Sequence, residues 1–67
     1  MPIAKTIEIS ADSDTSFDDA VKQGCKTACE KLDQVQSIWV KDQEVKVSDS
    51  GDINLYRVWM KVTFQLK

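Results

Sequence analysis

The stretch YRVWMKVTF, residues 56–64, decides the fold. Read as a strand, its alternate residues point to opposite faces of a sheet. One face carries an unbroken apolar row, which consists of Tyr56, Val58, Met60, Val62 and Phe64. The opposite row consists of Arg57, Trp59, Lys61 and Thr63. A sheet with one buried face usually presents polar groups on its other face, so the second row raises the question of why a Trp stands there.

Two further elements are predicted ahead of this strand. Residues 3–11, IAKTIEISA, alternate an apolar row with a polar row, which predicts a first strand. Ser16 followed by Asp19 resembles a capping box and predicts a helix start. Apolar or small residues then recur in steps of three and four, at Phe17, Ala20, Val21, Gly24, Cys25, Ala28, Leu32 and Val35. This pattern predicts an amphipathic helix of about five turns.

Residues 36–48, QSIWVKDQEVKVS, predict a second strand with an irregular register. Ile38 and Val40 share one row, whereas Trp39 and Val45 share the other, and such a change of phase is typical of a β-bulge. The turn SDSGD then leads into a final strand over residues 53–66. The chain order β-α-β-β predicts an α+β fold, in which a three-stranded antiparallel sheet with the spatial order 1-3-2 packs on one helix. Its uncovered face is predicted to carry Leu55, Trp59 and Trp39.

The small size of the chain predicts self-association. A single domain of 67 residues buries only about 60% of the surface that its unfolded chain exposes, so it needs an additional source of stability. Cys25 and Cys29 lie four residues apart in the predicted helix, where a disulfide would strain the helix. The absence of His leaves two thiols, which are too few for a tetrahedral zinc site. Exposed Trp side chains on an uncovered sheet face are better explained by contact between copies of the chain.

Composition argues against several classes of function. With 9 basic and 11 acidic residues and no basic stripe, the chain is unlike a nucleic-acid-binding protein. No apolar stretch approaches the ~20 residues that span a bilayer, so no membrane association is expected. The start MPIAKTIEIS lacks the apolar core of a signal peptide, which predicts a cytoplasmic protein with reduced thiols. Without His, and without a Ser or Cys beside a plausible base, no enzyme activity is expected.

Acidic residues gather at two places, the predicted helix start and the last turn. They are Asp12, Asp14, Asp18, Asp19, Asp49 and Asp52. Calcium takes six to eight oxygen ligands, often from such loops. However, Asp at caps and turns also binds the local backbone, and the spacing of an EF-hand is absent. We therefore assign no metal-ligating residue and keep calcium as an alternative.

Two segments resemble the dodecin family, SFDDAVKQGCKTACEKLDQVQSIWV and YRVWMKVTFQL. The resemblance covers residues 3–66, nearly the whole chain. It therefore predicts a single dodecin-like domain over residues 1–67. It implies a hollow homo-oligomer, a homododecamer, that sequesters or stores a flavin such as FMN, riboflavin or lumichrome between subunits. Many dodecins bind flavins in this way, and the resemblance implies a storage protein and not a turnover enzyme.

The resemblance also implies a flavin site built from Trp39, Arg57, Asp42 and Gln43. Trp39 matches the family's Trp that stacks on the isoalloxazine ring across a two-fold axis. Arg57 stands where the flavin-binding pattern has Gln, and it offers donors but no acceptor. Arg57 therefore either contacts the ligand or binds a carboxylate of a neighbouring subunit. Two other readings stay open: a non-flavin branch that binds a divalent cation such as calcium, and a protein-interaction module that uses the open sheet face.

Overall fold

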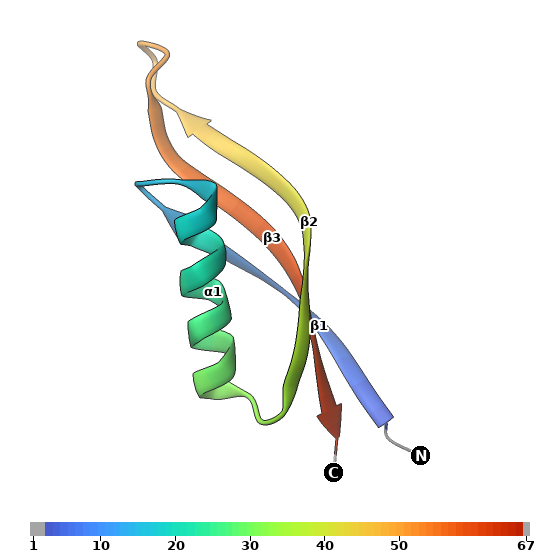
Figure 1. The fold of residues 1–67 in the computed structure, drawn as a ribbon. Helices are drawn as coiled ribbons and strands as arrows, with labels where there is room; N and C mark the ends of the chain where they lie inside the picture. The colour runs from blue at the N-terminus through green and yellow to red at the C-terminus, as the bar shows by residue number, and fades with distance from the viewer. Residues whose placement is uncertain (1–2, 67) are drawn as a thin grey trace.

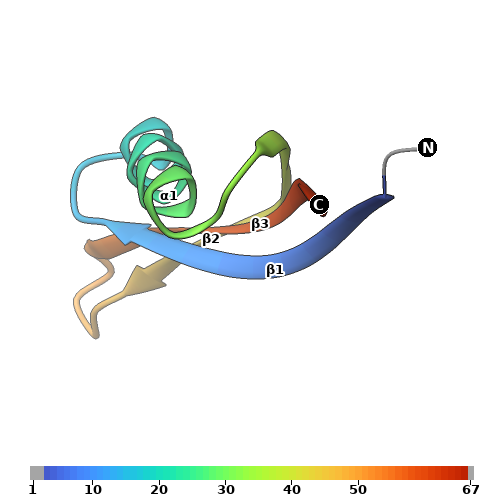
Figure 2. The ribbon, with the colours of Figure 1, turned by 90° about the horizontal axis from the view of Figure 1, so that it is seen from below.

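The long strand β3 (Ile53–Leu66) forms the centre of the structure, a computed structural model that describes residues 3–66. It is flanked by β1 (Ile3–Ser13) on one side and by β2 (Val35–Val47) on the other, which gives the strand order β1-β3-β2. Both neighbours run antiparallel to β3. The helix α1 (Phe17–Lys31) connects β1 to β2 and lies on one face of the sheet (Figures 1 and 2). The predicted α+β fold and its strand order are confirmed.

The helix begins where the sequence predicts but ends earlier. Ser16 is the N-cap, and its Oγ accepts a hydrogen bond of 3.0 Å from the backbone N–H of Asp19. The 15-residue helix ends at Lys31, so it has about four turns and the predicted length was wrong. The chain leaves the helix because Leu32 is extended and Gln34 adopts a positive φ of 57°. Val35, which continues the apolar pattern, already belongs to β2.

The core lies between α1 and the apolar row of β3. It contains the buried residues Ala20, Ala28, Val58, Met60 and Val62. At Gly24 the helix approaches the sheet so closely that an added Cβ would collide with the end of the Met60 side chain and lie 3.2 Å from Ala11 Cβ. The close packing predicted from the small residues of the helix is therefore confirmed, and Gly24 is the position that requires it.

Bulges in β2 decide which of its side chains point away from the helix. The register shifts between Val35 and Ser37, between Val40 and Asp42, and between Lys46 and Val47, which confirms the predicted irregularity. Since a shift of one residue exchanges the two faces of a strand, Trp39 on one side of the middle bulge and Asp42 on the other share a face.

The first strand extends two residues beyond the predicted Ala11, to Ser13. Asp12 thereby pairs with Arg57 within the sheet, and Ser13 donates a hydrogen bond of 2.6 Å to Asp19 Oδ2 beside the helix start. The single helix in the described part of the chain is too short and too polar to cross a bilayer.

Candidate ligand-binding face

The sheet face opposite α1 carries three of the four predicted site residues, namely Trp39, Asp42 and Arg57. Cross-strand partners point to the same face, so the register defines its members, which we call the open face. They include Thr6, Glu8, Ser10 and Asp12 of β1, Trp39, Asp42, Glu44 and Lys46 of β2, and Leu55, Arg57, Trp59, Lys61 and Thr63 of β3. The predicted grouping of Leu55, Trp59 and Trp39 is confirmed. Charged side chains outnumber these three apolar side chains, so the open face as a whole is polar.

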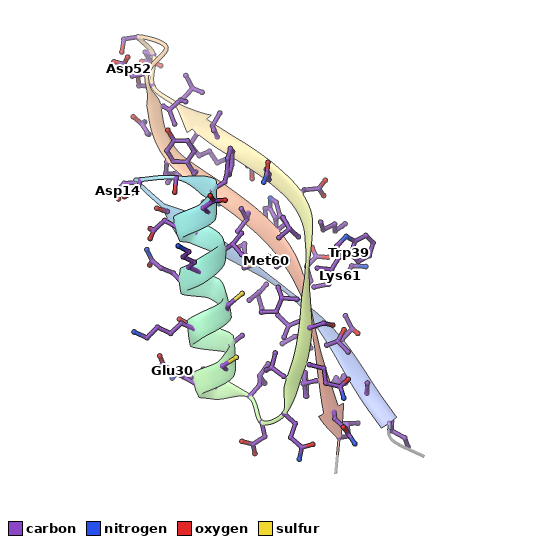
Figure 3. All side chains as sticks on the ribbon, viewed as in Figure 1. Asp14, Glu30, Trp39, Asp52, Met60 and Lys61 are labelled. Carbon is purple, nitrogen blue, oxygen red and sulfur yellow. The ribbon has the colours of Figure 1, made fainter. Side chains whose placement is uncertain are left out.

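Trp39 is the most exposed aromatic side chain of the open face. It projects from β2 away from the helix, beside Lys61 (Figure 3), and 65% of its surface is exposed. The Nζ atom of Lys61 lies 5.7 Å from the centre of the indole ring, a cation–π contact between cross-strand partners. Most of the indole surface therefore remains available for stacking.

Arg57 connects all three strands through carboxylates of its own chain. Its Nε donates to Asp12 Oδ1 at 2.7 Å and its Nη2 donates to Asp12 Oδ2 at 3.0 Å, so the pair is bidentate. Its Nη1 lies 3.8 Å from Glu44 Oε1 on β2. The sequence analysis expected Arg57 to contact a ligand or a carboxylate of a neighbouring subunit. In the structure, its guanidinium group already binds Asp12 and lies near Glu44 of its own chain.

The Trp59 side chain takes part in the same polar network. Its Nε1 donates a hydrogen bond of 3.1 Å to Glu44 Oε1, and Glu44 Oε2 lies 3.9 Å from Lys46 Nζ. Trp59 is half-buried, in contrast to Trp39. The Trp in the polar row of β3 is therefore accommodated by a carboxylate on the adjacent strand, which satisfies its single donor.

Asp42 and Gln43 line a hollow of about 450 Å³ on the open face. The other lining residues are Glu8, Lys41, Glu44 and Trp59. Asp42 lies opposite Trp59, whereas Gln43 lies opposite Val58 of the helix-facing row. Trp39 and Arg57 do not meet, because Trp39 pairs with Lys61 of β3, which is four residues from Arg57, or about 13 Å along the strand. One copy of the chain thus separates the predicted site residues into a Trp39 end and an Arg57 end.

The sequence analysis did not assign three residues of this face to the site, namely Lys61, Glu44 and Trp59. Lys61 shares the polar row of β3 with Trp59, which was visible in the alternation of residues 56–64. Its position opposite Trp39 depends on the bulges of β2, which the sequence predicts only in kind.

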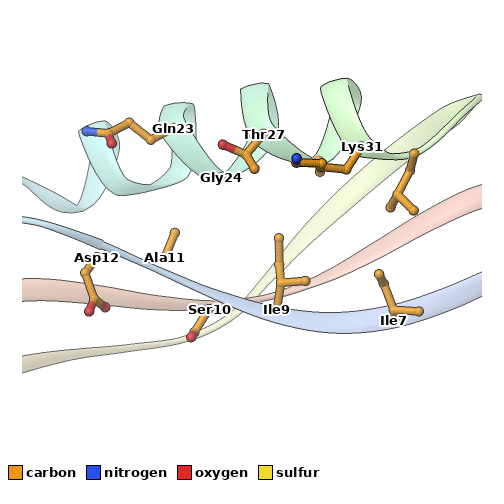
Figure 4. A pocket seen from close by; sticks show the side chains of 11 residues that line it. Ile7, Ile9, Ser10, Ala11, Asp12, Gln23, Gly24, Thr27 and Lys31 are labelled. Carbon is orange, nitrogen blue, oxygen red and sulfur yellow. The ribbon is translucent and has the colours of Figure 1, made fainter.

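A second hollow lies on the other side of the sheet, between α1 and β1 (Figure 4). It has a volume of about 470 Å³ and an apolar floor formed mainly by Ile7, Ile9, Ala11, Ala28 and Leu32. Its polar rim includes Asp12, Gln23, Thr27 and Lys31. It shares two lining residues with the open face, Ser10 and Asp12 of the edge strand β1.

The candidates for redox and metal chemistry are the two cysteines and the acidic residues. Cys25 is half-buried, Cys29 is exposed, and both are free thiols. Within residues 3–66, no three or more Cys, Asp or Glu side chains come together in a group that could hold a metal ion.

The Asp12–Arg57 pair predicts a stability loss in acid. The hydrogen bond from Arg57 lowers the pKa of Asp12, partial desolvation opposes this, and Coulomb attraction adds to it. The same hydrogen bond raises the pKa of Arg57. Because the folded-state pKa of Asp12 lies below its unfolded value of about 3.9, the pair stabilises the fold above that pH and ceases to do so as the pH falls through the folded-state pKa.

We therefore expect Arg57→Gln to raise the pKa of Asp12 towards its unfolded value and to reduce the difference in melting temperature between pH 7 and pH 3. The titration is measured by NMR of the side-chain carboxyl carbon. Lys22→Met, which removes a charge from the exposed side of α1, serves as the control. An Asp12 titration that is the same in both variants would contradict this assignment.

Comparison with known proteins supports both the fold and the resemblance of the sequence to dodecins. The sequence model of the dodecin family matches residues 3–67. A calcium dodecin from Mycobacterium tuberculosis is 28% identical over 67 residues, which cover 100% of this chain and 93% of the relative.

Solved structures of dodecins superimpose closely on the chain. The M. tuberculosis calcium dodecin is 28% identical, with a TM-score of 0.84 and coverage of 97% of this chain and 91% of the other. A dodecin from Streptomyces davaonensis is 26% identical, with a TM-score of 0.90 and coverage of 98% and 96%. A variant of the Thermus thermophilus dodecin, at 21% identity, a TM-score of 0.90 and coverage of 100% and 98%, supports the fold alone.

Proposed function

The chain belongs to the dodecin family, and from that premise we propose that it is a homododecameric protein that holds a flavin between subunits at Trp39. The chain is a small dodecin-like binding protein. We propose further that it sequesters or stores the ligand and catalyses no reaction. FMN, riboflavin and lumichrome are the expected ligands, and a cytoplasmic setting remains a prediction from the sequence.

The exposed indole of Trp39 is the observation that supports this proposal best. An indole that is 65% exposed on a rigid strand, next to a cation, is a preformed stacking surface. Planar aromatic rings gain both apolar contact and favourable ring–ring geometry by stacking on such a surface. Arg57 at the other end of the open face, and Asp42 between them, supply polar groups for the ligand's edge or for a second copy of the chain, whereas Gln43 pairs with Val58 of the helix-facing row.

Titration of riboflavin or FMN with purified protein tests the proposal. Stacking on an electron-rich indole is expected to quench the fluorescence of the flavin, and the titration is expected to saturate at micromolar protein. Flavin emission that stays unchanged at these concentrations would contradict the flavin function.

Assembly is tested separately by the mass in solution. Twelve copies of the 7.6 kDa chain would have a mass of about 91 kDa, to be measured by light scattering after size exclusion. We expect this mass without ligand, because a 67-residue fold gains much of its stability by burying further surface between copies. A mass near that of a single chain or of two chains would contradict the dodecamer and favour the protein-interaction module.

Calcium binding is the second candidate, favoured by the relative from M. tuberculosis that is named a calcium dodecin. A single copy does not fit this function well, because its described carboxylates form no metal-holding group and Asp12 and Glu44 already engage Arg57. Calcium would therefore require oxygen ligands from more than one copy. A calcium-dependent rise in melting temperature that a chelator reverses would establish this function, and no change would exclude it as a stabilising ligand.

A further inference from the structure

We propose that Lys61 makes the Trp39 site selective for planar aromatic ligands that carry negative charge. This inference rests on the proposed function, since it concerns the ligand that stacks on Trp39. It adds a specificity-determining residue that neither the resemblance nor the sequence pattern assigned.

The position of Lys61 carries the inference. Trp39 and Lys61 are cross-strand partners, and the Nζ atom lies 5.7 Å from the centre of the indole ring. Lys61 belongs to the central strand and is half-buried, so its stem is held by the sheet on both sides. A ring that stacks on Trp39 therefore comes close to a positioned ammonium group, either across the indole or at its edge.

The neighbouring charges leave this ammonium group without a carboxylate of its own. Glu8 lies opposite Lys61 on β1, but its Oε1 pairs with Lys41 Nζ at 3.5 Å. Within residues 3–66, no carboxylate oxygen lies within 4 Å of Lys61 Nζ. Asp42 is directed to the hollow beside Trp59, farther along the sheet. Lys41 and Lys61 balance the charges of Glu8 and Asp42. Selectivity for a negatively charged ligand therefore depends on Lys61 being the charged group that lies against the Trp39 ring.

The expected preference is modest. For an ammonium group and a ligand charge about 6–9 Å apart in a partly hydrated site, Coulomb attraction corresponds to a preference of about threefold to tenfold. Salt screens charges at this separation, so the preference should shrink as ionic strength rises.

Paired titrations of riboflavin and FMN test the proposal, because the two ligands share a ring system and differ by a phosphate. At low ionic strength we expect FMN to bind the wild-type protein about threefold to tenfold more tightly than riboflavin. Lys61→Met should bring the ratio of the two dissociation constants close to one, and Lys61→Arg should retain it. The matched control is Lys22→Met, which removes a lysine from the exposed side of α1, away from the open face, and should leave the ratio unchanged.

The outcomes separate this inference from the proposed function. If both ligands bind but the ratio is the same in wild type and Lys61→Met, the role of Lys61 is wrong while the flavin site stands. If neither ligand binds the wild-type protein, the flavin function is wrong, and selectivity among flavins falls with it.

A measurement without any flavin tests the local charge at Trp39 directly. In a Trp59→Phe background, the remaining indole fluorescence reports on Trp39 alone, because the chain has two Trp residues. Iodide should quench this emission more effectively than caesium. Adding Lys61→Met should lower the iodide-to-caesium quenching ratio by about twofold or more. An unchanged ratio would overturn the proposal whether or not a flavin binds.

Discussion

Trp39→Ala is expected to abolish flavin binding by the assembled protein. Truncation removes the stacking surface that is 65% exposed on the open face, together with the partner of Lys61. Loss of about 100 Å² of apolar contact and of ring stacking corresponds to at least a 30-fold weaker dissociation constant. The loss is greater if two copies stack on the same ligand. Quenching of riboflavin fluorescence measures the effect.

Trp59→Phe is the matched control for this variant, since it changes the other Trp of the same sheet face. Trp59 donates its N–H to Glu44 and is half-buried, so its replacement should cost some stability and leave most of the flavin affinity. Light scattering on both variants shows whether the assembly persists. Full quenching by assembled Trp39→Ala protein would remove Trp39 from the site, and a selective loss in Trp59→Phe would move the site along the sheet.

Met60→Ala is expected to have the largest effect on folding. Met60 is fully buried at the centre of β3, and the end of its side chain fills the space beside Gly24, which has no side chain. Truncation would leave a cavity that the helix cannot fill, at a cost of about 2–5 kcal/mol. A 67-residue domain has a total stability of only about 3–10 kcal/mol, so most of it would be lost. The midpoint of urea unfolding, at one fixed protein concentration, measures the change.

Met60→Leu separates the loss of volume from the loss of the thioether. A swap that nearly conserves volume should cost less than about 1.5 kcal/mol, because Leu can still occupy the space against the helix. An unfolding midpoint of Met60→Ala that equals that of the wild type would contradict the central position of this side chain in the core.

The helix shows where sequence reasoning succeeded and where it failed. Ser16 and Asp19 predict the start correctly, because capping involves residues three apart in the chain. The end was misplaced, since Leu32 and Val35 continue the apolar spacing of the helix while the backbone has already left it. After the helix, Gln34 adopts a positive φ, and its carbonyl oxygen accepts a hydrogen bond from the Gln65 N–H. This hydrogen bond joins residues 31 apart in the chain, so local spacing could not predict it.

The candidate site shows the same division. The alternation of residues 56–64 predicted both faces of β3, and with them the row that contains Trp59 and Lys61. Nothing in the sequence indicated that Asp12 would engage Arg57, because that contact requires β1 to continue to Ser13 and to pair in one particular register. The resemblance to dodecins named Trp39 and Arg57 together, whereas one copy of the chain holds them at different ends of the open face.

By itself the sequence determined the elements, their order and the two faces of the central strand, because these follow from short-range spacing and from the burial of one apolar row. Only the tertiary structure decided which side chains meet. The bulge between Val40 and Asp42 shifts the pairing of β2 with β3. The resulting register places Lys61 opposite Trp39 and Glu44 opposite Arg57, where Glu44 also accepts a hydrogen bond from the diagonal neighbour Trp59. Register is a property of two strands at once, so it depends on the fit of their side chains and hydrogen bonds and not on the spacing within either strand.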